Sequence, residues 1–163
     1  MVTSPAPLTR PTDRLSWLWL AVGMALLPFT GWQTVLPLAA WLAPPCLLRF
    51  ARTQRLVVAL PLVALATWAA TLVAWRNDYF GPPSLITALF MLVAGLPLVL
   101  GCLADRLLAP RLTGFPRTLA FPCTVTAVEF LMTLVNPLAA GGSLAYSQPG
   151  QLATQQLVAV TGM

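Results

Sequence analysis

The chain has 163 residues, of which 58% are hydrophobic and only 8% are charged. A soluble domain carries about 25% charged residues, so this composition excludes a cytosolic enzyme and a disordered chain. The net charge of +5 comes from arginines that lie between apolar runs instead of forming one patch. This distribution excludes nucleic-acid binding and indicates a polytopic membrane protein.

The sequence contains neither His nor Lys. Ser-His-Asp catalysis, His-based metal sites and Lys Schiff bases are therefore excluded within this chain. Cys46, Cys102 and Cys123 lie far apart, each in or at the end of an apolar run. Metal clusters need closely spaced Cys pairs. We expect these cysteines to be packing residues, and the sequence predicts no metal and no other cofactor.

The N-terminal segment 1–14 is polar and rich in proline, which predicts a disordered cytoplasmic lead-in. Two apolar runs follow, at 15–29 and 34–48. Each would form a helix of roughly 22 Å, shorter than the ~30 Å hydrocarbon core of a bilayer. The pair is either two short spans or a re-entrant hairpin. In both cases the chain returns to the side on which it started.

Longer apolar runs each predict a complete span, and they cover 56–75, 84–104 and 118–135. An extracytoplasmic loop is expected at 136–151. The last apolar stretch, 152–163, is too short to cross a bilayer and would leave backbone groups without partners in lipid. We interpret it as the start of a truncated further span.

Small residues mark two of these runs. Ala66, Ala70 and Ala74 recur every four residues, a spacing that lets helices approach closely. We interpret this stripe as packing within the bundle and not as an oligomer seam. The next run holds residues that predict a kink or a close helix contact, namely Gly95, Pro97 and Gly101.

The arginines set the predicted orientation. If every run crosses the membrane, Arg76 falls on one side and all the other arginines fall on the opposite side. Positively charged loops stay in the cytoplasm, so the N-terminus is predicted to be cytoplasmic. The predicted fold class is an all-α multispan transmembrane helix bundle, with five spans plus the start of a sixth.

Glu129 is the only acid well inside a predicted span, ~10 Å from the outer end of its helix. An ionised acid there costs about 2.5 to 3.5 kcal/mol, so it must be paired, neutral or facing a polar cavity. Two interpretations stay open: a contact in a substrate site or proton relay, and a structural acid bonded within the bundle. The uncharged loop 136–151 is likewise either a lipid-handling surface or an ordinary turn.

Several short motifs lie between Phe121 and Met163: Phe121-Pro122, Glu129-Phe130-Leu131, Gly142 ahead of Tyr146-Ser147-Gln148, Gln156, and Thr161-Gly162. Together they resemble the bacterial apolipoprotein N-acyltransferase family. In that family a helix with a Glu-Phe-Leu triplet leads into a loop that ends in Tyr-(Ser/Thr)-Gln. The number and phase of the earlier runs are also similar to that family.

The resemblance implies an enzyme of the bacterial cytoplasmic (inner) membrane that transfers an acyl chain from a phospholipid to the N-terminal amine of a diacylglyceryl-modified lipoprotein. The Glu-Lys-Cys catalytic set of the family belongs to a nitrilase-like domain of the carbon–nitrogen hydrolase superfamily. A chain without Lys cannot hold this set, so no catalytic residue is assigned and the chain alone is expected to be inactive. The resemblance assigns Glu129, Gly142, Tyr146 and Gln148 to the wall of the lipid site.

The sequence departs from the family pattern at two places. Met132 and Thr133 stand where the family often has Arg-Gly, and the segment 141–144 lacks a frequent Trp. A divergent member that acylates another amine fits these departures. The alternative function is a self-contained small polytopic membrane protein, such as a transporter subunit or an assembly partner, with no catalytic role. That alternative requires 152–163 to be a surface helix.

Overall fold

The computed structural model describes residues 15–31, 35–75 and 84–135, and all regular structure in these ranges is helical. The elements are α1 (Ser16–Leu26), the 3-10 helix η1 (Leu27–Thr30), α2 (Pro37–Thr53), α3 (Leu56–Ala74), α4 (Leu85–Ala94), α5 (Leu96–Leu108) and α6 (Pro116–Val135). The predicted all-α class is confirmed for this part of the chain. The predicted segments 1–14, 136–151 and 152–163 lie outside the described residues.

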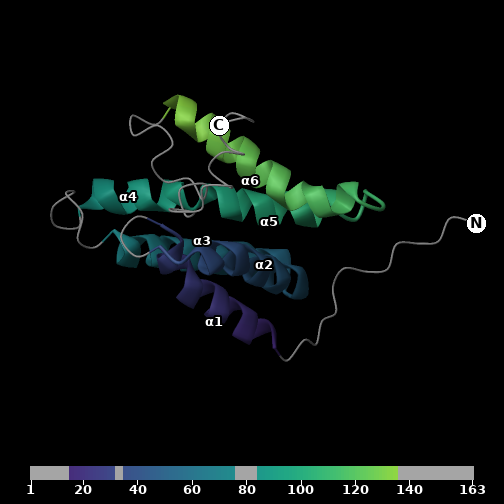
Figure 1. Cartoon of the computed structure of the whole chain (residues 1–163), viewed down its shortest axis with the longest axis horizontal. Helices are drawn as coiled ribbons and strands as arrows, with labels where there is room; N and C mark the ends of the chain where they lie inside the picture. The colour runs from purple at the N-terminus through teal and green to yellow at the C-terminus, as the bar shows by residue number, and fades with distance from the viewer. Residues whose placement is uncertain (1–14, 32–34, 76–83, 136–163) are drawn as a thin grey trace, which may run out of the picture.

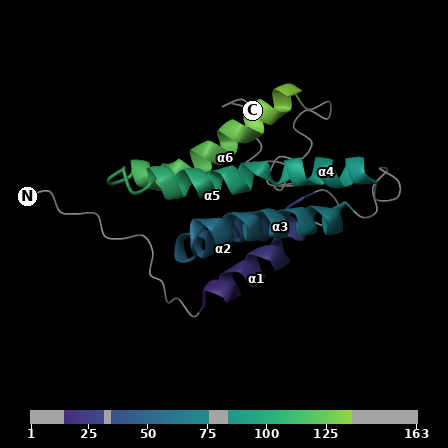
Figure 2. The ribbon, with the colours of Figure 1, turned by 180° about the vertical axis from the view of Figure 1, so that it is seen from behind.

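The helices pack in tiers (Figure 1). α2 and α3 lie side by side, and α4 and α5 follow one another across them as a single bent rod. α1 packs on the outer side of α2, and α6 packs on the outer side of α5 (Figure 2). α5 is therefore the only described helix that contacts both the central pair and α6 extensively.

Proline and glycine set several helix boundaries. α2 begins at Pro37, a position where the missing backbone N–H costs nothing. α4 ends at Ala94, Gly95 follows as the N-cap of α5, and Pro97 lies in the first turn of α5, so the two helices meet at a 40° bend. The predicted kink is therefore confirmed.

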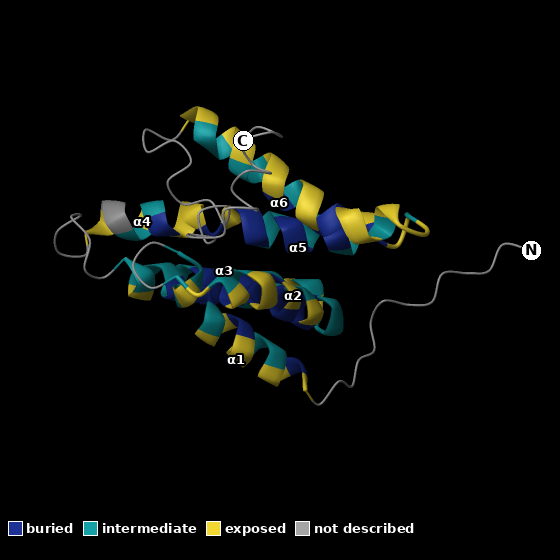
Figure 3. Cartoon of the chain, in the orientation of Figure 1, coloured by how far each residue is buried: buried dark blue, intermediate teal, exposed yellow. Residues whose placement is uncertain are grey.

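The core lies between α2, α3 and α5 and continues into the contact between α5 and the first half of α6, and its buried residues appear dark blue in Figure 3. Phe50 and Leu47 of α2 and Val63 of α3 are its largest fully buried apolar side chains. On the small-residue stripe, Ala66 and Ala70 are buried, which agrees with packing inside the bundle. Exposed apolar side chains cover the outer faces of the helices, as lipid contact requires and as a soluble monomer avoids.

Glycines bring three helix pairs together. A Cβ atom at Gly23 would lie 2.9 Å from Cδ2 of Leu47, and one at Gly95 would lie 2.5 Å from Oγ1 of Thr67. A Cβ atom at Gly101 would lie 2.6 Å from Cγ2 of Val125. These distances are too short for a real Cβ unless the neighbouring atom shifts, so glycine permits the close approach of α1 to α2, of α3 to the α4–α5 junction and of α5 to α6.

Two described helices are long and apolar enough to cross a membrane, namely α3 with 19 residues and α6 with 20. The bent pair of α4 and α5 counts as a third if it forms one span. The prediction of five complete spans is not supported by the described helices. α1 has only 11 residues, or roughly 16 Å, and α2 contains Pro44 and Pro45 and ends in a charged turn. Two or three candidate spans are consistent with a membrane protein.

Candidate functional site

The most buried acid of the described residues is Asp105 on α5, whose side chain is 0% exposed. Arg52 of α2 binds it through two hydrogen bonds: Nε donates to Oδ2 at 2.7 Å and Nη2 donates to Oδ1 at 2.6 Å. This two-pronged geometry is the strongest form of ion pair between side chains. The hydrogen bonds to Asp105 raise the pKa of Arg52 above its usual value. Partial burial lowers this pKa, and the negative charge of the Asp105 carboxylate raises it further. The guanidinium is therefore charged at every pH at which a protein stays folded.

Arg106, the residue after Asp105, closes the C-terminal end of α2. Its two Nη atoms donate to the backbone carbonyls of Arg52 and Gln54, each at 3.0 Å. The last carbonyls of a helix have no partner within the helix and carry its negative dipole end. The guanidinium of Arg106 supplies both hydrogen-bond donors and positive charge to these carbonyls. α5 is therefore bonded to the Arg52 side chain and also to the backbone at the end of α2.

A chain of hydrogen bonds joins α1 to the same end of α2. Gln54 Nε2 donates to Ser16 Oγ at 2.9 Å, and Ser16 Oγ lies 2.7 Å from Thr53 Oγ1. Thr53 Oγ1 donates in turn to the carbonyl of Phe50 at 2.8 Å, so Ser16 is the donor to Thr53. The start of α1 therefore lies against the end of α2, and the two helices form a hairpin that returns to one end of the bundle.

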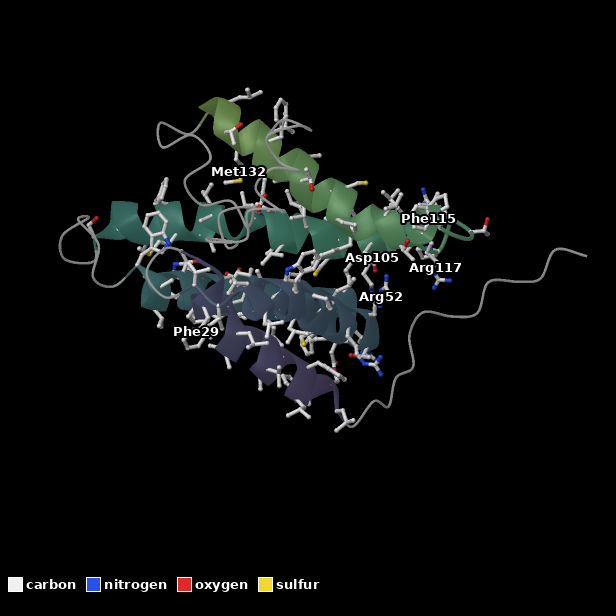
Figure 4. All side chains as sticks on the ribbon, in the orientation of Figure 1. Phe29, Arg52, Asp105, Phe115, Arg117 and Met132 are labelled. Carbon is white, nitrogen blue, oxygen red and sulfur yellow. The ribbon has the colours of Figure 1, made fainter. Side chains whose placement is uncertain are left out.

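This end of the molecule, which we call the arginine end, holds the described arginines: Arg49, Arg52 and Arg55 around the α2–α3 connection, and Arg106, Arg111 and Arg117 around the α5–α6 connection. Figure 4 shows Arg52, Asp105 and Arg117 together at this end. The Cζ atom of Arg49 lies 5.0 Å from the ring centroid of Trp19, a cation–π contact. The predicted grouping of these arginines on one side agrees with this placement.

Glu129, the acid singled out in the sequence, lies on α6 and is half-buried. Phe121, Val125 and Glu129 follow each other at four-residue intervals and so share one face of the helix. Phe121 and Val125 are buried against α5, whereas none of the α6 residues from 126 to 135 is buried. Figures 1 and 2 show why: α6 diverges from α5 toward its C-terminal end. Met132, one turn beyond Glu129, lies on the side of α6 that faces α4 (Figure 4).

The other predicted site residues, Gly142, Tyr146 and Gln148, lie outside the described residues. Cys46 and Cys102 are buried and Cys123 is exposed, all three as free thiols. Within residues 15–31, 35–75 and 84–135, no three His, Cys, Asp or Glu side chains come together as a metal site requires. The described part of the chain therefore offers polar contacts but no grouping of nucleophile, base and metal.

No protein-family model, curated protein or solved structure matches this chain. The resemblance to the N-acyltransferase family therefore rests on the short motifs between Phe121 and Met163. The sequence interpretation missed Asp105, because this residue directly follows the predicted 84–104 span and so is not an acid inside an apolar run. Its neighbour Arg106 and the rarity of acids in the chain were the available signals.

Proposed function

We propose that this chain is the membrane portion of an N-acyltransferase-like enzyme of the bacterial inner membrane. It anchors a catalytic domain, and it forms one wall of the path by which a phospholipid reaches that domain. The acyl donor is the phospholipid, and the acceptor is the N-terminal amine of a diacylglyceryl-modified lipoprotein. In this proposal the apolar runs make five crossings and begin a sixth, with the N-terminus in the cytoplasm.

The observation that carries the proposal is the position of Glu129 on α6. The helix is anchored to α5 through Phe121 and Val125 and then diverges, so Glu129 lies on the inner face just beyond the last buried contact. Apolar side chains surround it on the exposed faces of the same helix, including Phe130 and Leu131. An acid in this position offers a polar contact beside a surface suited to acyl chains.

A lipid-access role also fits the rest of α6. The helix has the length of a complete span, yet only its first half is packed in the described bundle. A helix held at one end leaves its other half open to lateral approach from the bilayer. The predicted loop residues Gly142, Tyr146 and Gln148 follow directly in sequence and would extend the same wall at the outer interface.

We expect Glu129→Gln, introduced in the complete reading frame that encodes this chain, to lower acyl transfer about tenfold. The loss of one charge-assisted hydrogen bond in the site, ~1.4 kcal/mol, accounts for this factor. The measurement is the N-acylated fraction of a lipoprotein, determined by mass spectrometry in cells depleted of their own N-acyltransferase.

Thr133→Val is the matched control, because Thr133 lies one turn from Glu129 and its hydroxyl donates to the carbonyl of Phe130. This variant should retain wild-type transfer. Equal transfer by wild type and Glu129→Gln would remove Glu129 from the site. A reading frame without a domain that holds Glu, Lys and Cys in nitrilase order would refute the acyltransferase proposal itself.

A second candidate is the self-contained membrane protein with no catalytic role. The Arg52–Asp105 pair favours it, because polar side chains bond α1 to α2 and α2 to α5 without a further domain. A purified chain that folds and resists denaturation by itself, encoded by a reading frame with no catalytic domain, would support this candidate.

A further inference from the structure

Two connections lie side by side at the arginine end. Arg106 reaches from α5 to the carbonyl of Gln54, so the α2–α3 connection at Gln54 and Arg55 adjoins the last turn of α5. The chain then passes through Arg111 to the start of α6, where Arg117 lies in the first turn. Figure 4 shows Phe115 and Arg117 at this same end.

The charges of this end are unbalanced. Among the described residues it holds six arginines and a single carboxylate, that of Asp105, which Arg52 already binds. Glu129, the other described acid, lies twelve residues along α6 from Arg117, or about 18 Å, beyond the reach of a direct ion pair. An anion that approaches this end from outside these residues therefore meets a surface with net positive charge.

Three of the arginines, which we call the arginine rim, carry part of this surplus at the surface: Arg55, Arg111 and Arg117. Arg55 and Arg111 are exposed, Arg117 is half-buried, and none of the three forms an ion pair with another described residue. A guanidinium presents a planar set of donors that matches two oxygens of a phosphate at once.

Apolar side chains adjoin the rim and indicate what kind of anion binds there. Phe115 is 72% exposed between Arg111 and Arg117, and exposed apolar side chains also lie two residues after Arg55, at Val57, and four residues before Arg111, at Leu107. A nucleic acid or an acidic peptide has no acyl chains to cover the exposed apolar faces of the neighbouring helices. A phospholipid offers both a phosphate for the arginines and acyl chains for the apolar faces of α3 and α6.

We propose that the arginine rim binds the headgroup phosphate of an anionic phospholipid, with the acyl chains against the exposed apolar side chains of the neighbouring helices. Each guanidinium near a membrane surface contributes on the order of 1 kcal/mol of attraction to anionic lipid. The site lies at the end of the bundle opposite to the proposed lipid-access wall and does not depend on acyl transfer.

The test uses the full chain purified in neutral detergent and titrated with phosphatidylglycerol or phosphatidylcholine of identical acyl chains. Native mass spectrometry reports the bound lipid. We expect a preference for phosphatidylglycerol, and about a hundredfold weaker binding of that lipid in the triple variant Arg55→Gln/Arg111→Gln/Arg117→Gln. Binding of phosphatidylcholine should be unchanged.

The triple substitution to Lys keeps the charge and should retain most of the preference for phosphatidylglycerol. As a single-charge comparison, Arg111→Gln should weaken binding about fivefold and Arg76→Gln should leave it unchanged. None of the three arginines is buried in the core, so circular dichroism of the triple variant should match wild type. Equal binding of both lipids, an unaltered preference in the Gln triple variant, or displacement of the lipid by inorganic phosphate would each overturn the proposal.

Discussion

Arg52→Met is expected to lower the free energy of unfolding by about 3 kcal/mol. Removing one partner of a buried ion pair costs about 3 to 5 kcal/mol, because the remaining charge stays buried without compensation. Here the remaining partner is Asp105, which is fully buried, whereas Arg52 is 34% exposed and touches water already. The lower end of the range applies because Arg52 is only partly buried, so the pair as a whole is not fully desolvated.

Titration with SDS in mixed micelles measures this loss, with helicity by circular dichroism as the signal. The double variant Arg52→Met/Asp105→Leu is the control: it removes both charges together and should recover most of the lost stability. A surface pair contributes at most about 1 kcal/mol. A cost of that size for Arg52→Met, with no recovery in the double variant, would show that the pair does not hold α2 to α5.

The sequence predicted the described helices well where hydrophobicity and helix length coincide. The run 56–75 became α3 (Leu56–Ala74), and 118–135 became α6 (Pro116–Val135). In both cases the apolar run ends where turn residues begin, so one signal marks both the helix and the membrane boundary.

Prediction and structure differ where the apolar run and the helix end at different residues. The run 34–48 was ended before Arg49, whereas α2 continues to Thr53. A charged turn leaves the apolar run without leaving the helix, and Arg52 extends α2 because it pairs with Asp105 on another helix. In the run 84–104, hydropathy stays high through Gly95, so the division into α4 and α5 came from glycine and proline alone.

The ion pair could not be predicted from the pattern. Arg52 and Asp105 are 53 residues apart, and no periodicity relates residues of two different helices. Burial also depends on neighbours: Asp105 is covered by α2, while Glu129, deep in an apolar run, is half-buried because α6 diverges from α5. Hydropathy shows only how deep an acid lies within an apolar run. How far that acid is buried depends on which other helices pack over it.

Gly101 controls the only extensive contact of α6 within the described bundle, and Gly101→Leu is expected to cost about 2 to 3 kcal/mol. A Cβ atom there would lie 2.6 Å from Cγ2 of Val125 and 3.1 Å from two ring carbons of Phe121. Val125 is β-branched and cannot rotate away within a helix. Inserting a larger side chain into a packed contact costs about 1 to 3 kcal/mol, and a Leu adds three further carbons to the one that already clashes.

The same SDS titration measures the effect, with Gly31→Ala as the matched control. A Cβ at Gly31 meets no atom within 4 Å, so this variant should stay within about 0.5 kcal/mol of wild type. The pair Gly101→Ala/Val125→Ala exchanges volume across the contact and should be less destabilised than Gly101→Ala alone. If Gly101→Leu were as stable as Gly31→Ala, α6 would not be seated on α5 through this glycine. The position of Glu129 relative to α5 would then lose its structural basis, because Phe121 and Val125 are what fix it.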